Sequence, residues 1–384
     1  MWKGESKNIA ILDFSKAFDT VPHRKLLHKL KSYGIRGQLH KWISSFLCNR
    51  FMKVVVDGEV SSETEVVSGV PQGTVLGPLL FLVHINDLPD HVTSNVRLFA
   101  DDCLLYRQIK SEKDQEELQR DLCNLEAWAS NWGMKFNAKK CYILTITNKG
   151  KSKFYQLNNY ILKSVENNPY LGVLFDNKLS WSTHIDHISK KASSSLGFVM
   201  RNLKKCPTEC KKTAYAALVR STLEYGAVVW DPFLEKDILK LEKINRKAAR
   251  FIKGDFKTRT PGCVTEMMCD LDLPTLQKRR KEKRLSFLYN IQTGKVPAIN
   301  KDAYLKPIRQ KRKIKAKSFS DCVTINILTR HQNLNSKCFQ LPESVSTVYR
   351  HSFFPKTISE WNELDEKIVS APSVDTFKNR LRQF

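Results

Sequence analysis

The sequence contains no long hydrophobic run and few acidic residues for its number of basic ones. Its longest nearly apolar stretch, residues 75–85, is interrupted by Gly77, Pro78 and His84. A membrane-spanning helix needs about 20 apolar residues, so this stretch is far too short. The first residues also lack the charged, apolar and small-residue regions of a secretory signal. We therefore expect a soluble protein without a transmembrane segment.

The cysteines form no disulfide or zinc pattern. They number 10 in 384 residues, and the chain, with 41% hydrophobic residues, is long enough to bury a core without disulfides. Cys206 with Cys210, and Cys263 with Cys269, could each be half of a zinc site, but neither pair has the neighbouring Cys or His pair that such a site requires. We interpret the cysteines as reduced thiols.

The charge is strongly one-sided. Sixty-four Lys and Arg residues stand against 39 Asp and Glu residues, a net charge of +25, of which +6 falls in residues 1–192 and +19 in residues 193–384. Such a chain gains affinity for polyanions by neutralising phosphates and releasing counterions. Nucleic acid is therefore the first candidate partner and an anionic membrane surface the second, and composition alone does not choose between them.

Three aspartates are the sharpest chemical feature. Residues 8–13 form a short apolar run, typical of a buried strand, that ends in Asp13. Residues 96–106 form two apolar arms around Asp101 and Asp102, which predicts a β-hairpin with both acids at its turn. An isolated Asp-Asp pair is ordinary turn chemistry. If the strand of Asp13 is a neighbour of the hairpin, however, three carboxylates converge and require hard cations such as Mg²⁺.

Two such ions about 4 Å apart support in-line displacement at a phosphate, as in polymerases and nucleases. Around the acids, the spacing predicts helices over 23–32 and 39–47 and a hairpin over 52–67 that turns at Asp57-Gly58. A Gly/Pro-rich loop over 68–78 should open a helix. We expect Asp19 to cap the helix that starts near Pro22 rather than to bind metal.

Five segments of the sequence resemble successive motifs of reverse transcriptases, in the same order and at similar spacing. They are residues 12–23 (LDFSKAFDTVPH), 68–81 (SGVPQGTVLGPLLF), 99–102 (FADD), 132–140 (WGMKFNAKK) and 170–175 (YLGVLF). The set is similar to the polymerase of non-LTR retrotransposons, closest to jockey-like and chicken-repeat-like elements. Residues 241–251, 353–362 and 370–378 resemble the carboxy-terminal region of those proteins.

The resemblance implies a fold and an activity. It implies an α+β palm over residues 1–175, with antiparallel strands and helices on one face, then a helical thumb-like region over 176–260 and a basic C-terminal region of uncertain fold over 261–384. The implied activity is that of an RNA-directed DNA polymerase, which extends a DNA primer on an RNA template with deoxynucleoside triphosphates and two Mg²⁺ ions, or Mn²⁺. The implied location is intracellular, in nucleus and cytoplasm.

The resemblance also implies roles for individual residues. Asp13, Asp101 and Asp102 would hold the metals, with the backbone carbonyl of Phe14. Phe18 would block a ribose 2′-hydroxyl, although composition alone favours a plain core phenylalanine. The remaining roles are nucleotide and template contact for Gln72 and Gly73, a triphosphate contact for Lys140, and a grip on the primer end for Leu171 and Gly172.

The second half carries the basic surfaces. Residues 236–252 have an apolar stripe at helical spacing and a polar face with Lys240, Lys243, Lys247 and Arg250, which we interpret as nucleic-acid-binding in the polymerase context, with a solvated surface as the alternative. Denser clusters over 278–284 and 309–317 are compatible with template binding, nuclear import or a basic linker.

One departure from the family leaves a second function open. Reverse transcriptases place further motifs, including most of the fingers, before the strand of Asp13, whereas here that strand begins near Asn8. We expect an N-terminally truncated copy without an endonuclease domain. The alternative function is accordingly a catalytically silent remnant that still binds nucleic acid. A metal-dependent nuclease is weaker, because it leaves Gln72 and Lys140 unexplained.

Overall fold

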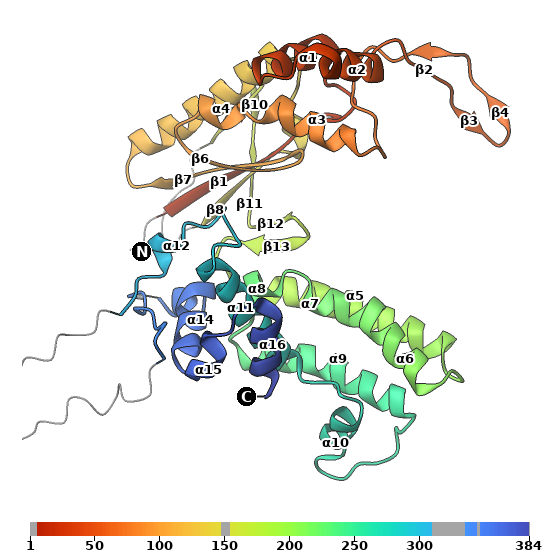
Figure 1. The fold of residues 1–384 in the computed structure, drawn as a ribbon, viewed down its shortest axis with the longest axis vertical. Helices are drawn as coiled ribbons and strands as arrows, with labels where there is room; N and C mark the ends of the chain where they lie inside the picture. The colour runs from red at the N-terminus through yellow and green to blue at the C-terminus, as the bar shows by residue number, and fades with distance from the viewer. Residues whose placement is uncertain (1–5, 147–153, 309–334, 344–345, 384) are drawn as a thin grey trace, which may run out of the picture. The chain divides into compact units, whose positions relative to one another are not determined.

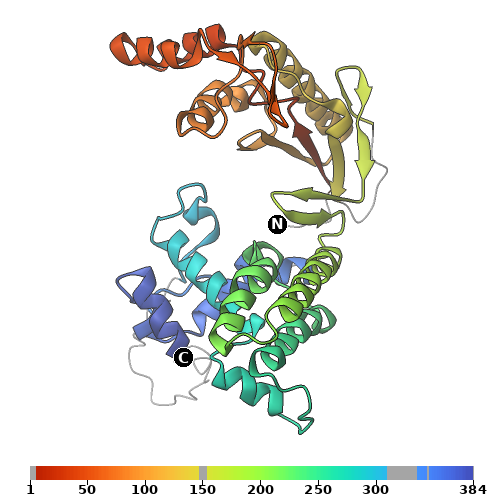
Figure 2. The same ribbon diagram turned by 90° about the vertical axis from the view of Figure 1, so that its right-hand side faces the viewer.

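The computed structural model describes residues 6–146, 154–308, 335–343 and 346–383 (Figures 1 and 2). The chain forms two compact units. The N-terminal unit runs to residue 170 and includes residues 175–179, and the C-terminal unit comprises residues 171–174 and those from 180 onward. The acids predicted from the sequence all lie in the N-terminal unit.

The N-terminal unit is a mixed α and β structure. Its elements are β1 (Ser6–Asp13), α1 (His23–Ser32), α2 (Gly37–Leu47), β2 (Phe51–Met52), β3 (Val55–Val56), β4 (Glu59–Val60), β5 (Thr64–Glu65), α3 (Leu76–Ile85), the 3-10 helix η1 (Leu88–His91), β6 (Asn95–Phe99), β7 (Asp102–Ile109), α4 (Glu112–Trp132), the 3-10 helix η2 (Ala138–Lys140), β8 (Tyr142–Ile146), β9 (Gln156–Leu157), β10 (Tyr160–Ile161), β11 (Lys163–Val165) and β12 (Asn167–Tyr170). The chain passes between the units in the segment of β12 and β13 (Val173–Asp176).

The main sheet has the strand order β11-β8-β1-β7-β6, with β1 at its centre. Each pair of adjacent strands in this sheet is antiparallel except the pair β11 and β8, which is parallel. In β1 the side chains of Asn8, Ala10 and Leu12 are buried, as the two-residue period of a strand requires. Helices α1, α3 and α4 lie on one face of the sheet (Figure 1), and their apolar side chains join the sheet in one core. The predicted α+β class and antiparallel sheet are confirmed.

Local sequence signals explain several elements. Helix α1 has the predicted bounds, and α2 begins two residues before the predicted start, at Gly37. The β3–β4 hairpin turns at Asp57 and Gly58, whose φ values of 51° and 91° are those that a two-residue hairpin turn of type I′ requires. Helix α4 begins with a reciprocal capping box between Ser111 and Asp114.

The C-terminal unit is helical. Its helices are α5 (Ser182–Asn202), α6 (Thr208–Ala214), the π-helical turn η3 (Tyr215–Arg220), α7 (Ser221–Glu224), α8 (Ala227–Trp230), α9 (Glu235–Lys253), α10 (Cys263–Asp270), α11 (Leu276–Gln292), α12 (Lys301–Tyr304), α13 (Thr347–Arg350), α14 (Phe353–Asn362), α15 (Glu366–Val369) and α16 (Val374–Gln383). Helix α9 packs against α5, α6 and α10, and α11 packs against α8, α9, α14 and α16. The helices after residue 261 therefore share one unit with α5 to α9.

Two further expectations can be compared with the described residues. None of their helices is both long enough and apolar enough to cross a bilayer. The nine cysteines among them are all free thiols, as predicted.

Candidate active site

The strand register brings the predicted acids together. Asp13, the last residue of β1, is the cross-strand partner of Asp102, the first residue of β7. Opposite residues of an antiparallel pair have Cα atoms about 5 Å apart, and their side chains share a face. Asp101 lies one residue earlier, in the two-residue turn after β6, where Ala100 has a φ of 49°. The predicted convergence of the strand and the hairpin is confirmed.

The three carboxylates influence one another electrostatically. Partial burial raises the pKa of Asp13 and the charge of Asp101 adds to this, while Lys140 opposes it. Burial also raises the pKa of Asp102, and the charges of Asp101 and Asp13 raise it further. Lys140, predicted to contact the triphosphate, thus lies within electrostatic reach of the acids. The cluster carries repulsion that a bound cation would relieve.

The backbone around Asp13 is held from two sides. Its N–H donates to the thiol of Cys141 at 3.4 Å, and its carbonyl accepts from the N–H of Asn137 at 2.8 Å. The next ring, Phe14, stacks on Phe136 with centroids 4.2 Å apart. These contacts fix the direction in which the Asp13 side chain leaves the sheet.

The donor chemistry of this cluster fits a hard divalent cation. Three carboxylates and the carbonyl of Phe14 offer only oxygen, the ligand atom that Mg²⁺ prefers, and no hydrogen bond between described residues uses that carbonyl. Within the described ranges, no three Asp, Glu, His or Cys side chains stand as a ready-made ligand group. The arrangement therefore supplies suitable donors that would have to close around an ion.

The Gly-rich loop is joined to the chain that follows β1. The N–H groups of Gly69 and Val70 donate to the carbonyls of Val21 and Phe18, both at 2.8 Å. Gly69 has a φ of 91°, and a Cβ there would lie 2.9 Å from the carbonyl oxygen of Asp19. Only glycine permits this approach of two backbones.

Asp19 does not cap α1, so that prediction was wrong. The helix begins after Pro22 without any side-chain cap. Instead, the amide of Gln72 donates to the Asp19 carboxylate at 2.9 Å. The Gly-rich loop returns to Asp19 from 53 positions away in the chain and provides a donor that local sequence does not reveal. Gln72 and Gly73 are both exposed, as a loop that contacts a ligand must be.

Phe18 contacts both the hydrophobic core and the Gly-rich loop. Its ring is half-buried and stacks on the buried Phe81 of α3, with centroids 4.6 Å apart. Its backbone carbonyl holds Val70 of the Gly-rich loop. The residue thus packs on the core and anchors the loop that carries Gln72.

Leu171 and Gly172 form a tight turn that belongs to the C-terminal unit. Their φ values are 47° and 76°, both left-handed. The hydroxyl of Tyr225 donates to the carbonyl of Leu171 at 3.0 Å. The turn predicted to grip a primer therefore has a defined support within its own unit.

A basic groove runs between α5 and α9. Lys240, Lys243 and Lys247 line it, as does Lys190 of α5. Lys240 forms an exposed ion pair with Asp186. Lys243 and Lys247 are also exposed, but no ion pair joins them to a described residue. Arg250 is not among the groove residues, since its guanidinium donates to the carbonyl of Asp255 at 3.3 Å and to the thiol of Cys263 at 3.4 Å.

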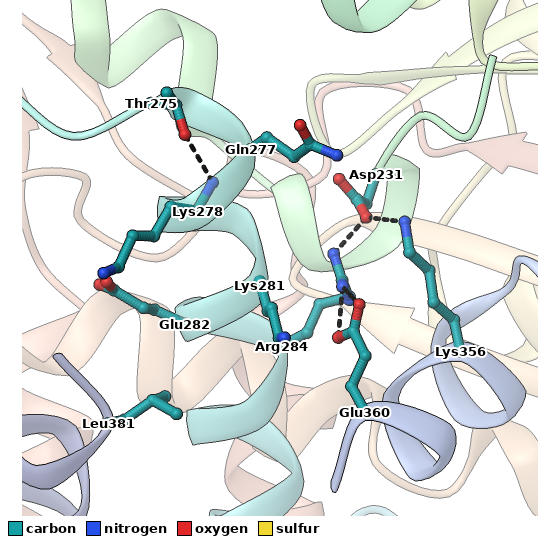
Figure 3. Close-up of a pocket in the computed structure, with 10 residues that line it drawn as sticks. All are labelled: Asp231, Thr275, Gln277, Lys278, Lys281, Glu282, Arg284, Lys356, Glu360 and Leu381. Carbon is teal, nitrogen blue, oxygen red and sulfur yellow. Dashed lines mark hydrogen bonds and ion pairs between the residues drawn. The ribbon is translucent and has the colours of Figure 1, made fainter. Parts of the chain in front are cut away.

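The basic cluster over 278–284 lies in helix α11 and is therefore no linker, and two of its arginines are buried in ion pairs. Arg280 and Arg284 are 1% and 2% exposed, and both donate to Asp231. Lys356 of α14 bonds to the same carboxylate, and Arg284 also bonds to Glu360 (Figure 3). Periodicity in α11 could not reveal this, because the acids come from other helices and loops.

Cations of the neighbouring turns are paired as well. Arg279 and Lys283 bond to Glu224 of α7, itself buried. Burial acts to raise the pKa of Glu224, but the hydrogen bonds from Arg279 and Lys283 outweigh it and hold the pKa below its usual value. The cluster over 309–317 lies outside the described residues.

The sequence analysis did not identify two tyrosines, one near the acidic cluster and one at the Leu171–Gly172 turn. Tyr170 lies within electrostatic reach of Asp102, which adds to burial in raising the pKa of the phenol. Tyr225 supports Leu171 from 54 positions along the chain. Nothing in either local pattern distinguishes these tyrosines from ordinary core or surface residues.

Several known proteins are similar to this chain. The family described as reverse transcriptase (RNA-dependent DNA polymerase) matches residues 2–175. The RNA-directed DNA polymerase from mobile element jockey of Drosophila melanogaster is 34% identical over 260 residues, which cover 64% of this chain and 28% of the relative. The probable RNA-directed DNA polymerase from transposon BS of the same species is 26% identical and covers 82% and 35%.

Among solved structures, apo telomerase from Candida tropicalis is 10% identical and covers 77% of this chain and 52% of the telomerase, with a TM-score of 0.39. The chain spans about a third of the length of the retrotransposon relatives named above.

Proposed function

We propose that this chain, whose residues 2–175 match the reverse transcriptase family, is the polymerase part of a jockey-like retrotransposon protein that copies RNA into DNA. The observation that carries the proposal is the register that pairs Asp13 with Asp102 beside Asp101. Lys140 acts on the same acids. A carboxylate cluster of this kind serves nucleotidyl transfer by two divalent ions.

We assign the metals to Asp13, Asp101, Asp102 and the Phe14 carbonyl. Two Mg²⁺ ions there would activate the primer 3′-hydroxyl and stabilise the leaving pyrophosphate. The three carboxylates must be ionised to bind them, and burial with mutual repulsion raises the pKa of Asp13 and Asp102. Metal affinity should therefore fall as the pH is lowered.

The remaining residues position the substrates. Lys140 contacts the triphosphate and donates a proton as pyrophosphate leaves. Gln72 and Gly73 border the incoming nucleotide, with Gln72 oriented by Asp19. Phe18 leaves no room for a 2′-hydroxyl, which favours deoxynucleotides.

The lysine groove of α5 and α9 is the proposed contact to the nucleic-acid backbone. Lys243 and Lys247 form no ion pair with any residue that the structure describes and can neutralise phosphates, while Lys240 must first leave Asp186. Each phosphate neutralised by a lysine should add about 0.9 to the slope of log K against log salt. The guanidinium of Arg250 is instead bonded to Asp255 and Cys263, which follow the C-terminal end of α9. We assign the palm role to the N-terminal unit and the thumb-like role to α5–α9.

Primer extension on an RNA template tests the proposal. The assay is run on the 384-residue chain and on the chain preceded by the segment that precedes the matched region in the jockey polymerase, because the chain spans 28% of that relative. Extension should require Mg²⁺ or Mn²⁺, and Asp101→Asn should slow it at least about 100-fold. The exposed carboxylate of Asp90 supplies the matched control, Asp90→Asn, which should extend normally.

A second measurement does not depend on activity. Mn²⁺ binding, followed by the paramagnetic resonance of the free ion, should weaken on Asp13→Asn and remain unchanged on Asp90→Asn. Absence of extension in both forms, with nucleic-acid binding retained, would instead establish the catalytically silent nucleic-acid-binding remnant.

A further inference from the structure

A pocket of about 390 Å³ lies in the C-terminal unit, where residues of α11, α14 and α16 come together (Figure 3). Its volume falls within the range of about 300–1,000 Å³ that is usual for small-molecule sites. The residues that line it are polar or charged, with Leu381 as the exception. Such a lining suits a charged ligand rather than an apolar one.

Cations outnumber carboxylates around this pocket. Four cations and three carboxylates line it, namely Lys278, Lys281, Arg284 and Lys356 against Asp231, Glu282 and Glu360. The buried Arg280 adds a fifth positive charge, because it bonds to the same Asp231. The group therefore carries an excess of two positive charges, which one dianion would balance.

Two of the three carboxylates are already neutralised within the protein. Asp231 accepts from Arg280, Arg284 and Lys356. Both oxygens of Glu360 accept from Arg284. The carboxylate that remains, Glu282, forms no ion pair inside the described ranges, so it is the one that opposes an anion.

The arginines of this network have hydrogen-bond donors left over. Nη1 and Nη2 of Arg280 and Nε of Arg284 are buried and have no partner among the residues that the structure describes. Buried polar groups nearly always have a partner, so an orphaned donor points to a water, an ion or a ligand. Arg284 is 2% exposed and lines the pocket. A bound acceptor would supply the partner that its Nε–H lacks.

Further donors of the pocket are not needed to hold the helices together. The ammonium groups of Lys278 and Lys281 form no ion pair with a residue of the described part of the chain. The hydroxyl oxygen of Thr275 accepts the N–H of Lys278 at 3.1 Å, which leaves its proton to donate elsewhere. Guanidinium and ammonium groups are the side chains that most often bind phosphate.

We propose that this pocket binds the phosphate group of a small phosphorylated molecule. Lys278 and Lys281 bind the phosphate oxygens, Arg284 donates its Nε–H, and the charge of Glu282 limits the affinity. All these residues belong to the C-terminal unit, whereas the acidic cluster belongs to the N-terminal one. The site does not depend on the proposed polymerase function.

Thermal unfolding of the full chain tests the proposal at constant ionic strength, with chloride exchanged for the added anion. Inorganic phosphate and glycerol 3-phosphate should raise the melting temperature saturably, because they bind the folded state, and glycerol should not. Hydrogen exchange of the α11 amides should slow with the same dependence on phosphate concentration. An effect of phosphate that spares these amides would overturn the location of the site.

Three substitutions separate the pocket from the other cations of this basic chain. Lys281→Gln should raise the apparent Kd for phosphate about tenfold, as for one lost hydrogen bond between charged groups, and Lys278→Gln, at an exposed position, should act in the same direction. Glu282→Gln should lower the Kd. The control is Lys301→Gln, an exposed lysine of α12, which should leave it unchanged. Equal affinities in the wild type and both pocket lysine variants would refute the site.

The source of the phosphate is tested with an RNA oligonucleotide that carries either a 5′-phosphate or a 5′-hydroxyl. The two should bind equally and be equally insensitive to Lys281→Gln. Tighter binding of the 5′-phosphorylated form that disappears in Lys281→Gln would assign the pocket to the end of a nucleic acid and overturn the small-molecule ligand. None of these measurements uses primer extension, so their failure would leave the proposed polymerase function untouched.

Discussion

Replacing Asp231 with asparagine should destabilise the C-terminal unit strongly. Its carboxylate is 7% exposed and bonds to Arg280, Arg284 and Lys356. Asparagine keeps the shape but removes the charge, so three cations remain close together and Arg280 stays buried. Removing one partner of a buried ion pair costs about 3–5 kcal/mol. A whole domain is stable by only about 5–15 kcal/mol, so the variant should be close to unfolding.

The assay is urea unfolding, with hydrogen exchange of the α11 amides to separate the C-terminal unit from the N-terminal one. The matched control is Asp186→Asn, which breaks the exposed pair with Lys240 and should leave the urea midpoint nearly unchanged. Adding Arg280→Met to Asp231→Asn should restore part of the loss, because it removes a buried charge. A cost below about 1 kcal/mol for Asp231→Asn would refute the view that this carboxylate holds the helices together.

Three further outcomes are expected. Gly69→Ala should cost about 1–3 kcal/mol in denaturant unfolding, because alanine must adopt a φ of 91° and approach Asp19; wild-type stability would contradict the backbone contact. Burial lowers the pKa of both His84 and His184 to about 4, against 6.5 for an ordinary histidine. The unfolded chain thus binds more protons between these values, and the stability of each unit should fall as the pH drops from about 6.5 to about 4; His84→Gln should flatten the pH dependence in the N-terminal unit alone. Phe18→Ala should admit ribonucleotides in primer extension, whereas a residue that only packs on the core would change stability and leave sugar choice unaltered.

The part of the site that depends on strand ends was predictable from sequence. Asp13 and the pair Asp101–Asp102 follow from apolar runs that stop at an acid, because strand period and turn chemistry are local properties. The same holds for the hairpin at Asp57 and for α1.

Contacts between distant segments were not predictable. Asp19 stands just before a helix and is suited to cap it, but Gln72 reaches it from another loop. In sequence, the arginines of α11 resemble a solvated basic face. In the structure they pair with Asp231 and Glu224, which lie about 50 residues earlier in the chain. In both places tertiary partners override a correct local rule. The roles of Lys140, Gly172 and the groove lysines stay predictions, because they concern substrates.

The alternation of buried and less buried side chains along β1 also determines which deletions in this strand leave a folded protein. Asn8, Ala10 and Leu12 face the interior, and Asp13 is tied to β7 by register. An in-frame loss of one codon before Leu12 would turn every earlier residue of the strand to the opposite face, whereas a loss of two codons would restore the facing. Among engineered deletions in this strand, those of an even number of codons should therefore yield folded protein more often than those of an odd number.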